Sequence, residues 1–263
     1  MEDGMNTVLS RPWLRLAIGL IAPALILIWW QSQATAGDAR ALAFAPLGTI
    51  GSTFIELVEN GSLISDMLAT VSRSLTGLLI GGMLGFATGV VMAVWSPLDR
   101  VLGPLLNAIR QVPLIGWLPL IGLWFGTGEG SQLIVISISA FFPTLLNSYA
   151  GVANAEARYL DVGRIYGFTP VQRFRLILLP SAMSLILTGF TQALAFAWIA
   201  SIATEILLGV GRGLGVTMQL AQTQQRLDVI LVAIIATAVV GFAINHLFLL
   251  LRRHLLRWQA APL

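Results

Sequence analysis

Six windows along the chain consist mainly of apolar side chains and contain no acidic residue and no arginine. They cover residues 16–37, 74–95, 111–128, 130–155, 176–204 and 229–251. An α-helix needs about 20 apolar residues to cross the ~30 Å hydrocarbon core of a bilayer, and each window is close to or above that length. A soluble protein would need further amphipathic helices to shield so many apolar helices from water. The pattern therefore predicts an all-α, polytopic membrane bundle with six transmembrane helices.

Composition supports this prediction and excludes several classes of chemistry. Hydrophobic residues make up 57% of the chain and charged residues only 10%, against roughly 25% charged residues in soluble domains. Cysteine is absent, which excludes disulfides and cysteine metal sites. All 15 basic residues are arginine, so the lysine of a nucleotide-binding P-loop and that of a Schiff-base enzyme are both missing.

The arginines predict the orientation in the membrane. With a cytoplasmic N-terminus, one set of arginines lies in cytoplasmic segments: Arg11, Arg15, Arg100, Arg110, Arg158, Arg164, Arg173, Arg175, Arg252, Arg253 and Arg257. The opposite side holds only Arg40, Arg73, Arg212 and Arg226. This positive-inside bias places both termini in the cytoplasm. It also explains the formal charge of +3 as a topology signal rather than a sign of nucleic-acid binding.

Two segments of the N-terminal quarter can each be interpreted in two ways. The basic start, the apolar run 16–30 and the triplet Ala34-Thr35-Ala36 imitate a signal peptide, but the cleavage site is deep, so we predict a first membrane helix. The stretch 38–72 combines acidic residues with apolar residues at helical spacing. We predict an external amphipathic elbow, with an ordinary solvated loop as the alternative. The predicted divisions are 1–37, 38–72, a five-helix core 73–251 that includes the loop 156–175, and a basic tail 252–263.

Glycine and proline patterns predict how the helices pack. The second window carries Gly77, Gly81, Gly85 and Gly89, a ridge of small residues along which two helix backbones approach closely. Pro113 and Pro119 predict a kinked third helix buried within protein. The glycine-rich stretch 209–215 predicts a flexible external turn or gate, followed by a short amphipathic helix over 216–225.

The segment 155–175 predicts a helical hairpin in the cytoplasm. An amphipathic helix ends at Gly167, and a second helix follows with Thr169 as N-cap, Pro170 in the first position and Gln172 completing a capping box. The hairpin is too polar to enter the bilayer. It therefore offers a surface to a soluble partner.

The same segment resembles a known family. Asp161-Val162-Gly163, three residues, Gly167, nine residues and Ile177-Leu178-Leu179-Pro180 match the pattern Glu-Ala-Ala, x3, Gly, x9, Ile-x-Leu-Pro of binding-protein-dependent ABC importer permeases. Asp161 replaces the usual glutamate, and Val162-Gly163 replaces two alanines. Flanking stretches are similar to the aliphatic sulfonate, taurine and nitrate branch: Ser72-Arg73-Ser74-Leu75, Arg110-Gln111-Val112-Pro113, Leu118-Pro119-Leu120, Trp124-Phe125-Gly126, and Ala203-Thr204-Glu205 before Gly213-Leu214-Gly215. The resemblance covers about residues 60–258.

This resemblance implies a type I importer permease fold in the bacterial inner membrane. The hairpin would be the coupling helix that docks on a cytoplasmic ATPase, and the implied ATPase-coupling residues are Asp161, Val162, Gly163, Gly167, Ile177, Leu179 and Pro180. The implied partners are a second permease copy, usually in a homodimer, two ATPase subunits, an external solute-binding protein and membrane lipid, with no nucleic acid. ATP and Mg would bind the ATPase, and this chain would hold no cofactor. The implied cargo is a small anion such as an aliphatic sulfonate, taurine or nitrate.

Three polar or aromatic residues of the predicted helices are candidates for the translocation pathway or its gate. Arg73 and Glu205 lie at external helix ends, where they could pair with each other, line the entry path or contact the binding protein. Trp198 could line the pathway or face lipid or core. His246 could relay protons, although an interhelical hydrogen bond fits its apolar surroundings better. We find no metal-ligand spacing and no catalytic triad or dyad.

Two other classes of protein remain as alternatives. A self-sufficient secondary transporter or channel would need coupling-ion groups at mid-membrane, where the predicted helices hold almost no carboxylates. A membrane enzyme would need clustered His, Asp or Glu at one depth. Uptake measured with and without a partner ATPase separates the first alternative from an ABC importer.

Overall fold

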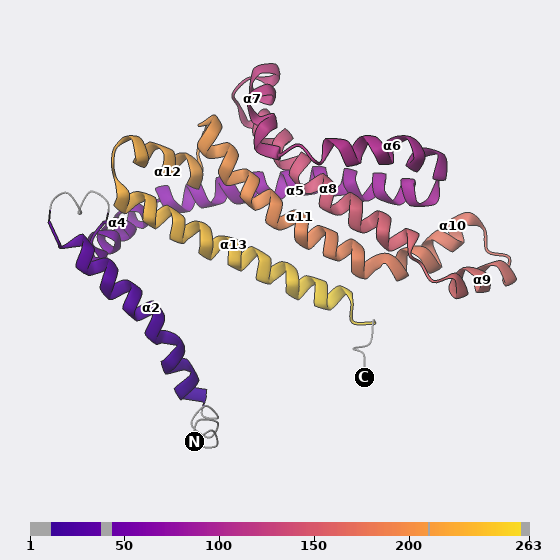
Figure 1. Cartoon of the computed structure of the whole chain (residues 1–263), viewed down its shortest axis with the longest axis horizontal. Helices are drawn as coiled ribbons and strands as arrows, with labels where there is room; N and C mark the ends of the chain where they lie inside the picture. Colours follow the sequence, from indigo (N-terminus) through magenta and orange to yellow (C-terminus); the bar gives the residue numbers. More distant parts are fainter. Residues whose placement is uncertain (1–11, 38–43, 210, 259–263) are drawn as a thin grey trace. The chain divides into compact units, whose positions relative to one another are not determined.

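The fold is helical throughout the part of the chain that the computed structural model describes, residues 12–37, 44–209 and 211–258 (Figure 1). In chain order the elements are α2 (Pro12–Ala34), α4 (Leu47–Glu59), α5 (Ser62–Val94), α6 (Ser96–Ile109), α7 (Leu114–Phe125), α8 (Glu129–Ala153), α9 (Ala157–Ile165), α10 (Pro170–Arg173), a π-helical turn (Phe174–Leu178), α11 (Leu179–Leu208), α12 (Leu214–Thr223) and α13 (Leu227–Leu255). The all-α prediction is confirmed.

The chain divides into two compact units. The first contains α2, α4 and the segment Leu220–Val232, and the second contains Ser62–Gln219 together with Ala233–Leu263. Within the first unit, Thr53 of α4 donates a hydrogen bond of 2.7 Å to Asp228 at the start of α13. Arg226 pairs with the same carboxylate at 2.6 Å. These contacts attach the amphipathic α4 to the first turn of α13.

Four continuous helices in the described part of the chain are long and apolar enough to cross a membrane. They are Ser62–Val94, Glu129–Ala153, Pro170–Leu208 and Leu227–Leu255, and α6 with α7 gives a fifth span if the bent pair counts as one. The first predicted span coincides with α2, in which the side chains of residues 12–18 lie outside the described set.

The third predicted span is corrected by the structure. Instead of one kinked helix over 111–128, the chain forms α6 and α7, which meet at 95°. With 12 residues, α7 is only about 18 Å long and cannot cross the hydrocarbon core by itself. The break falls before Pro113, whereas Pro119 stays inside α7.

The predicted external elbow is also shorter than expected. Only Leu47–Glu59 forms a separate amphipathic helix in the described part of 38–72, and residues 38–43 lie outside that part. Residues 62–72 are the first turns of α5. Their acidic Asp66 accepts a hydrogen bond of 2.6 Å from Thr217 at the start of α12, so this end of α5 is held against the following elements.

The glycine ridge of α5 packs against α8 of the same chain. A Cβ atom at Gly81, Gly85 or Gly89 would collide with a backbone carbonyl of α8, and one at Gly77 would collide with the side chain of Ile136. Small residues thus let α5 and α8 touch backbone to backbone, which is how helices associate in lipid, where hydrophobic burial does not drive packing. The helix α11 packs on both, and these three helices form the centre of the second unit.

Candidate functional site

The hairpin at α9 has the caps that its sequence predicts. Gly167 has φ +65°, and the Phe168 N–H donates to the Gly163 carbonyl at 2.9 Å, which closes a Schellman-type end to α9. After this turn, Thr169 and Gln172 form a reciprocal capping box, with the Thr169 N–H donating to Gln172 Oε1 at 2.8 Å. The reversal of the chain is therefore specified by local hydrogen bonds.

The second helix of the hairpin is the start of a membrane span. α10, the π-helical turn and α11 run continuously from Pro170 to Leu208. The π-helical turn ends immediately before Leu179-Pro180. Pro180 has no N–H to donate, and a local change of helical hydrogen bonding accommodates this loss without ending the helix. The hairpin is thus continuous with a helix long and apolar enough to cross a membrane.

Two of the predicted coupling residues lie in contact. Gly163 is buried, and a Cβ atom at this position would lie 2.7 Å from Ile177 Cδ1. Leu179 at the start of α11 packs with the buried residues Val152 of α8 and Ala182 of α11. These contacts hold α9 on the π-helical turn and that turn on the membrane helices.

The outer surface of the hairpin is apolar to an unusual degree. Ile165 is 83% exposed and Tyr166 is 74% exposed, while Val162 is half-exposed. Beside them, Val162, Phe168, Ile177 and Pro180 help to line a cavity of about 330 Å³. Asp161 also lies on this surface, where it pairs with Arg164 at 2.9 Å. Exposed apolar side chains on a segment too polar to enter the bilayer are typical of an interaction surface.

Arg73 and Glu205 form a buried ion pair between α5 and α11. Arg73 Nη1 lies 2.5 Å from Glu205 Oε1, and both side chains are buried. The other carboxylate oxygen accepts hydrogen bonds from Thr70 Oγ1 at 3.1 Å and from the Gly215 N–H at 2.8 Å. Of the roles considered for these two residues, mutual pairing is the one that the structure displays.

The glycine-rich turn closes over this ion pair. A Cβ atom at Gly213 or Gly215 would collide with the Glu205 side chain, so only glycine lets the backbone approach it. Arg73 Nη2 also donates to the Arg212 carbonyl at 3.2 Å. These contacts hold residues 212–215 against α5 and α11. Residue 210 of the predicted turn lies outside the described residues, and its role as a flexible turn or gate stays a prediction.

Trp198 lies where α11 meets α13. A Cβ atom at Gly241 would be 2.7 Å from Trp198 Nε1, so the indole packs on the backbone of α13. The side chain lines a small apolar cavity with Leu194, Gly241 and Ile244. Trp198 thus packs between two helices of the chain, as its core alternative describes, and its pathway role stays a prediction. His246 stacks on Phe242 within α13.

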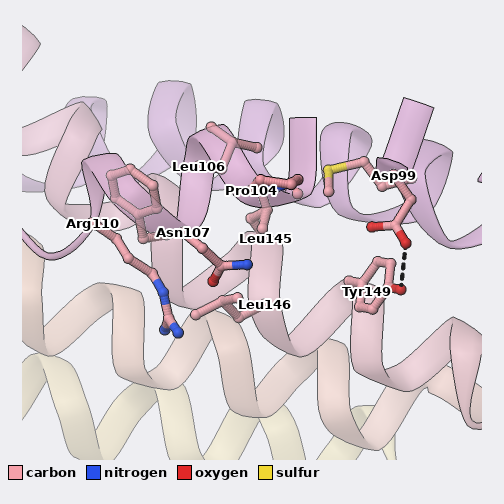
Figure 2. Close-up of a pocket in the computed structure, with 11 residues that line it drawn as sticks. Asp99, Pro104, Leu106, Asn107, Arg110, Leu145, Leu146 and Tyr149 are labelled. Atoms are coloured by element: carbon pink, nitrogen blue, oxygen red, sulfur yellow. Dashed lines mark hydrogen bonds between the residues drawn. The ribbon is translucent and has the colours of Figure 1, made fainter. Parts of the chain in front are cut away.

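A larger cavity lies elsewhere, between α7, α8 and α11. It measures about 570 Å³, and its lining includes Arg110, Ser139, Asn147, Gln192 and Phe196. A neighbouring cavity of about 380 Å³ follows α6 and α8 and shares Arg110, Phe142 and Leu146 with the first (Figure 2).

Arg110 lies at the break between α6 and α7. The positive-inside count places it in a cytoplasmic segment, which stays a prediction; in the structure it caps α6 and lines both cavities. Figure 2 shows Arg110 and Asn107 at one end of the smaller cavity, with the hydrogen bond of 3.0 Å from Tyr149 to Asp99 at the other. The available signal was the pair Arg110-Gln111 two residues before Pro113, together with isolated amides inside two spans.

The comparisons with known proteins agree with this architecture. Residues 77–260 match the family described as binding-protein-dependent transport system inner membrane component. The chain is 32% identical to the aliphatic sulfonates transport permease protein SsuC of Bacillus subtilis, over 92% of this chain and 87% of that protein. It is 27% identical to the taurine transport system permease protein TauC of Escherichia coli, over 93% and 90%.

A solved structure shares the fold. The crystal structure of an amino acid ABC transporter with histidines aligns with a TM-score of 0.60 at 19% identity, over 76% of this chain and 98% of that one. The family match spans most of the residues that form α5 to α13. The chain thus belongs to the binding-protein-dependent transport system inner membrane components, the multi-pass permease subunits of ABC importers.

Proposed function

We propose that this permease moves a small sulfonate-type anion into the cytoplasm and that α9 couples this movement to ATP hydrolysis on a separate ATPase subunit. The observation that carries the proposal is the hairpin of α9, Gly167 and Thr169, which presents exposed apolar side chains and continues into a membrane span. ATP and Mg bind the ATPase, since this chain has no lysine for a P-loop. The chain by itself hydrolyses no ATP.

The geometry supports transmission of movement from the ATPase through the hairpin to the helix Pro170–Leu208. Ile165, Tyr166 and Val162 form the docking surface for the ATPase, and Asp161 lies beside them. When the ATPase pair closes, the hairpin moves and the continuous helix Pro170–Leu208 moves with it. Coupling is then a shift of population between inward-facing and outward-facing states, driven by contacts that differ between the two.

The remaining parts of the assembly follow from the family. A second copy of this chain completes the pathway, so that two hairpins meet two ATPase subunits, and an external solute-binding protein delivers the cargo. Both termini are cytoplasmic, because most arginines then lie inside. The sulfonate-type cargo is supported by the two relatives named for aliphatic sulfonates and taurine.

The test is uptake of labelled taurine and ethanesulfonate into liposomes that contain the permease with its ATPase and binding protein. Uptake should require ATP and the ATPase, and liposomes with the permease alone should neither hydrolyse ATP nor take up solute. Uptake by the permease alone, driven by an ion gradient, would instead establish a secondary transporter. ATP-dependent uptake that excludes both sulfonates would retain the importer and refute the cargo.

A further inference from the structure

We propose that the 570 Å³ cavity between α7, α8 and α11 is an anion-binding station on the transport route, in which Arg110 and the Gln192 amide bind the sulfonate group of the solute. This assignment rests on the proposed function for the nature of the solute. The position of the site rests only on the side chains that line the cavity.

Arg110 supplies an uncompensated positive charge. No ion pair or hydrogen bond joins its guanidinium to the described residues, and it is the only basic residue in the lining of either cavity. The only acidic residue in the two linings is Asp99, and it accepts a hydrogen bond from Tyr149 at the far end of the smaller cavity (Figure 2). A planar guanidinium matches the oxygens of sulfonate, carboxylate or phosphate groups.

The polar side chains that share the cavity with Arg110 make this charge significant. Ser139 lies near the middle of α8, Asn147 lies in its C-terminal third, and Gln192 lies near the middle of α11. Polar groups within membrane-spanning helices are costly unless they line a protein cavity or a water-filled path. Arg110 is exposed and lines the same cavity as these polar residues, which points to a role in solute passage.

The amide pair is oriented to donate to an anion. Asn147 Nδ2 donates to Gln192 Oε1 at 3.0 Å and to the Pro143 carbonyl at 2.8 Å, which uses both of its N–H groups. The Gln192 acceptor is thereby occupied, while no described residue accepts from its Nε2. The free donors of the pair therefore belong to Gln192, whose side chain is exposed to the cavity.

The rest of the lining suits a short organic tail. Trp117, Phe142 and Phe196 contribute aromatic surface, and the volume falls within the roughly 300–1,000 Å³ typical of small-molecule sites. One cation, one amide donor pair and an aromatic wall together favour a small organic anion over a bare cation or a neutral sugar.

The test uses the absence of native cysteine. Phe196→Cys places a thiol in the cavity, and Ile199→Cys on the same helix lies outside both cavity linings. In the reconstituted complex, the rates of labelling by a sulfonate-bearing and an ammonium-bearing methanethiosulfonate are compared. A focused positive charge should favour the anionic reagent at the thiol of Phe196→Cys by about tenfold, while the thiol of Ile199→Cys should show no such preference.

Charge variants then test whether Arg110 causes the preference for the anionic reagent. In the Phe196→Cys background, Arg110→Gln should reduce the ratio of the two labelling rates to near one, and Arg110→Lys should retain most of it. Arg100→Gln removes the same charge from an exposed position of α6 outside both linings, and it should leave the ratio unchanged. No labelling of Phe196→Cys, or a ratio that Arg110→Gln leaves intact, would overturn the proposal.

Protection of the thiol by solute separates a failure of the proposed site from a failure of the proposed cargo. Taurine and ethanesulfonate should slow the labelling of Phe196→Cys when Arg110 is present and lose this effect in Arg110→Gln. Charge selectivity without protection by either sulfonate would retain an anion site and refute the sulfonate. Sulfonate uptake that Arg110→Gln leaves unaltered would retain the cargo and refute the site.

Discussion

Ile177 occupies the space that a side chain at position 163 would need. The Ile177 Cδ1 atom would lie 2.7 Å from a Cβ atom at Gly163, and Gly163 is buried. The two residues belong to opposite arms of the hairpin, α9 and the π-helical turn. The spacing between Gly163 and the Ile177-Leu178-Leu179-Pro180 stretch thus brings a residue without a side chain against a large apolar side chain.

This contact predicts the effect of enlarging Gly163. Gly163→Val should displace α9 from the π-helical turn at a cost of about 1–3 kcal/mol, since it overpacks a filled site. We expect binding-protein-stimulated ATP hydrolysis and uptake to fall severalfold while the protein still inserts. Adding Ile177→Ala to the same chain restores space and should recover part of the activity. Loss without any recovery in the double variant would contradict the packing explanation.

The buried ion pair predicts an asymmetric response to mutation. Arg73→Met leaves the Glu205 carboxylate buried without its partner, which costs about 3–5 kcal/mol. Replacing both residues, by Arg73→Met with Glu205→Leu, should cost less. Thermal unfolding of the purified permease measures the order, and equal destabilisation in the two variants would show that the charge pairing is unimportant.

The same pair predicts how tightly residues 212–215 are held. Arg73 and Glu205 hold the glycine-rich turn by hydrogen bonds to the Arg212 carbonyl and the Gly215 N–H. In Arg73→Met, trypsin added from outside should cleave after Arg212 faster than in the wild type. As a control, Arg226 lies in a different turn and its cleavage rate should not change. Unchanged cleavage after Arg212 would mean that other contacts hold the turn.

Topology gives a prediction that does not depend on transport. A reporter active only in the cytoplasm should work when fused after Leu263 or inserted in the 156–175 loop. It should stay silent when placed near Glu59 or Glu129, which the arginine bias assigns to the outside. The reverse pattern would overturn the orientation and the cytoplasmic position of α9.

The helices and the hairpin were predictable because their signals are local. Charge-free apolar windows mark spans, and the combination of Gly167, Thr169, Pro170 and Gln172 specifies a turn through caps within a few residues. The capping box was therefore predicted correctly, down to the partner of Thr169.

The remaining features depend on residues far apart in the chain. The partners Arg73 and Glu205 are 132 residues apart, and no local pattern selects their pairing among the alternatives. The break at residues 110–113 was missed because a proline in an apolar window predicts a kink but not a turn of 95°. From the sequence Arg110 carries only topology information, whereas in the structure it also lines a cavity.

Gly167→Val tests most directly whether the α9 hairpin couples transport to ATP hydrolysis. Gly167 has φ +65°, where a β-branched residue is disfavoured by about 1–2 kcal/mol, although a Cβ atom would meet open space. Gly128→Val, at φ −165° and also with open space, is the matched control.

The measurement is ATP hydrolysis and taurine uptake in the same liposomes, with permease, ATPase and binding protein present. We predict that Gly167→Val inserts normally and assembles but loses substrate-stimulated ATP hydrolysis and uptake together, while Gly128→Val retains both. Normal uptake by Gly167→Val with its ATPase bound would show that the hairpin is an ordinary connector and would contradict the account.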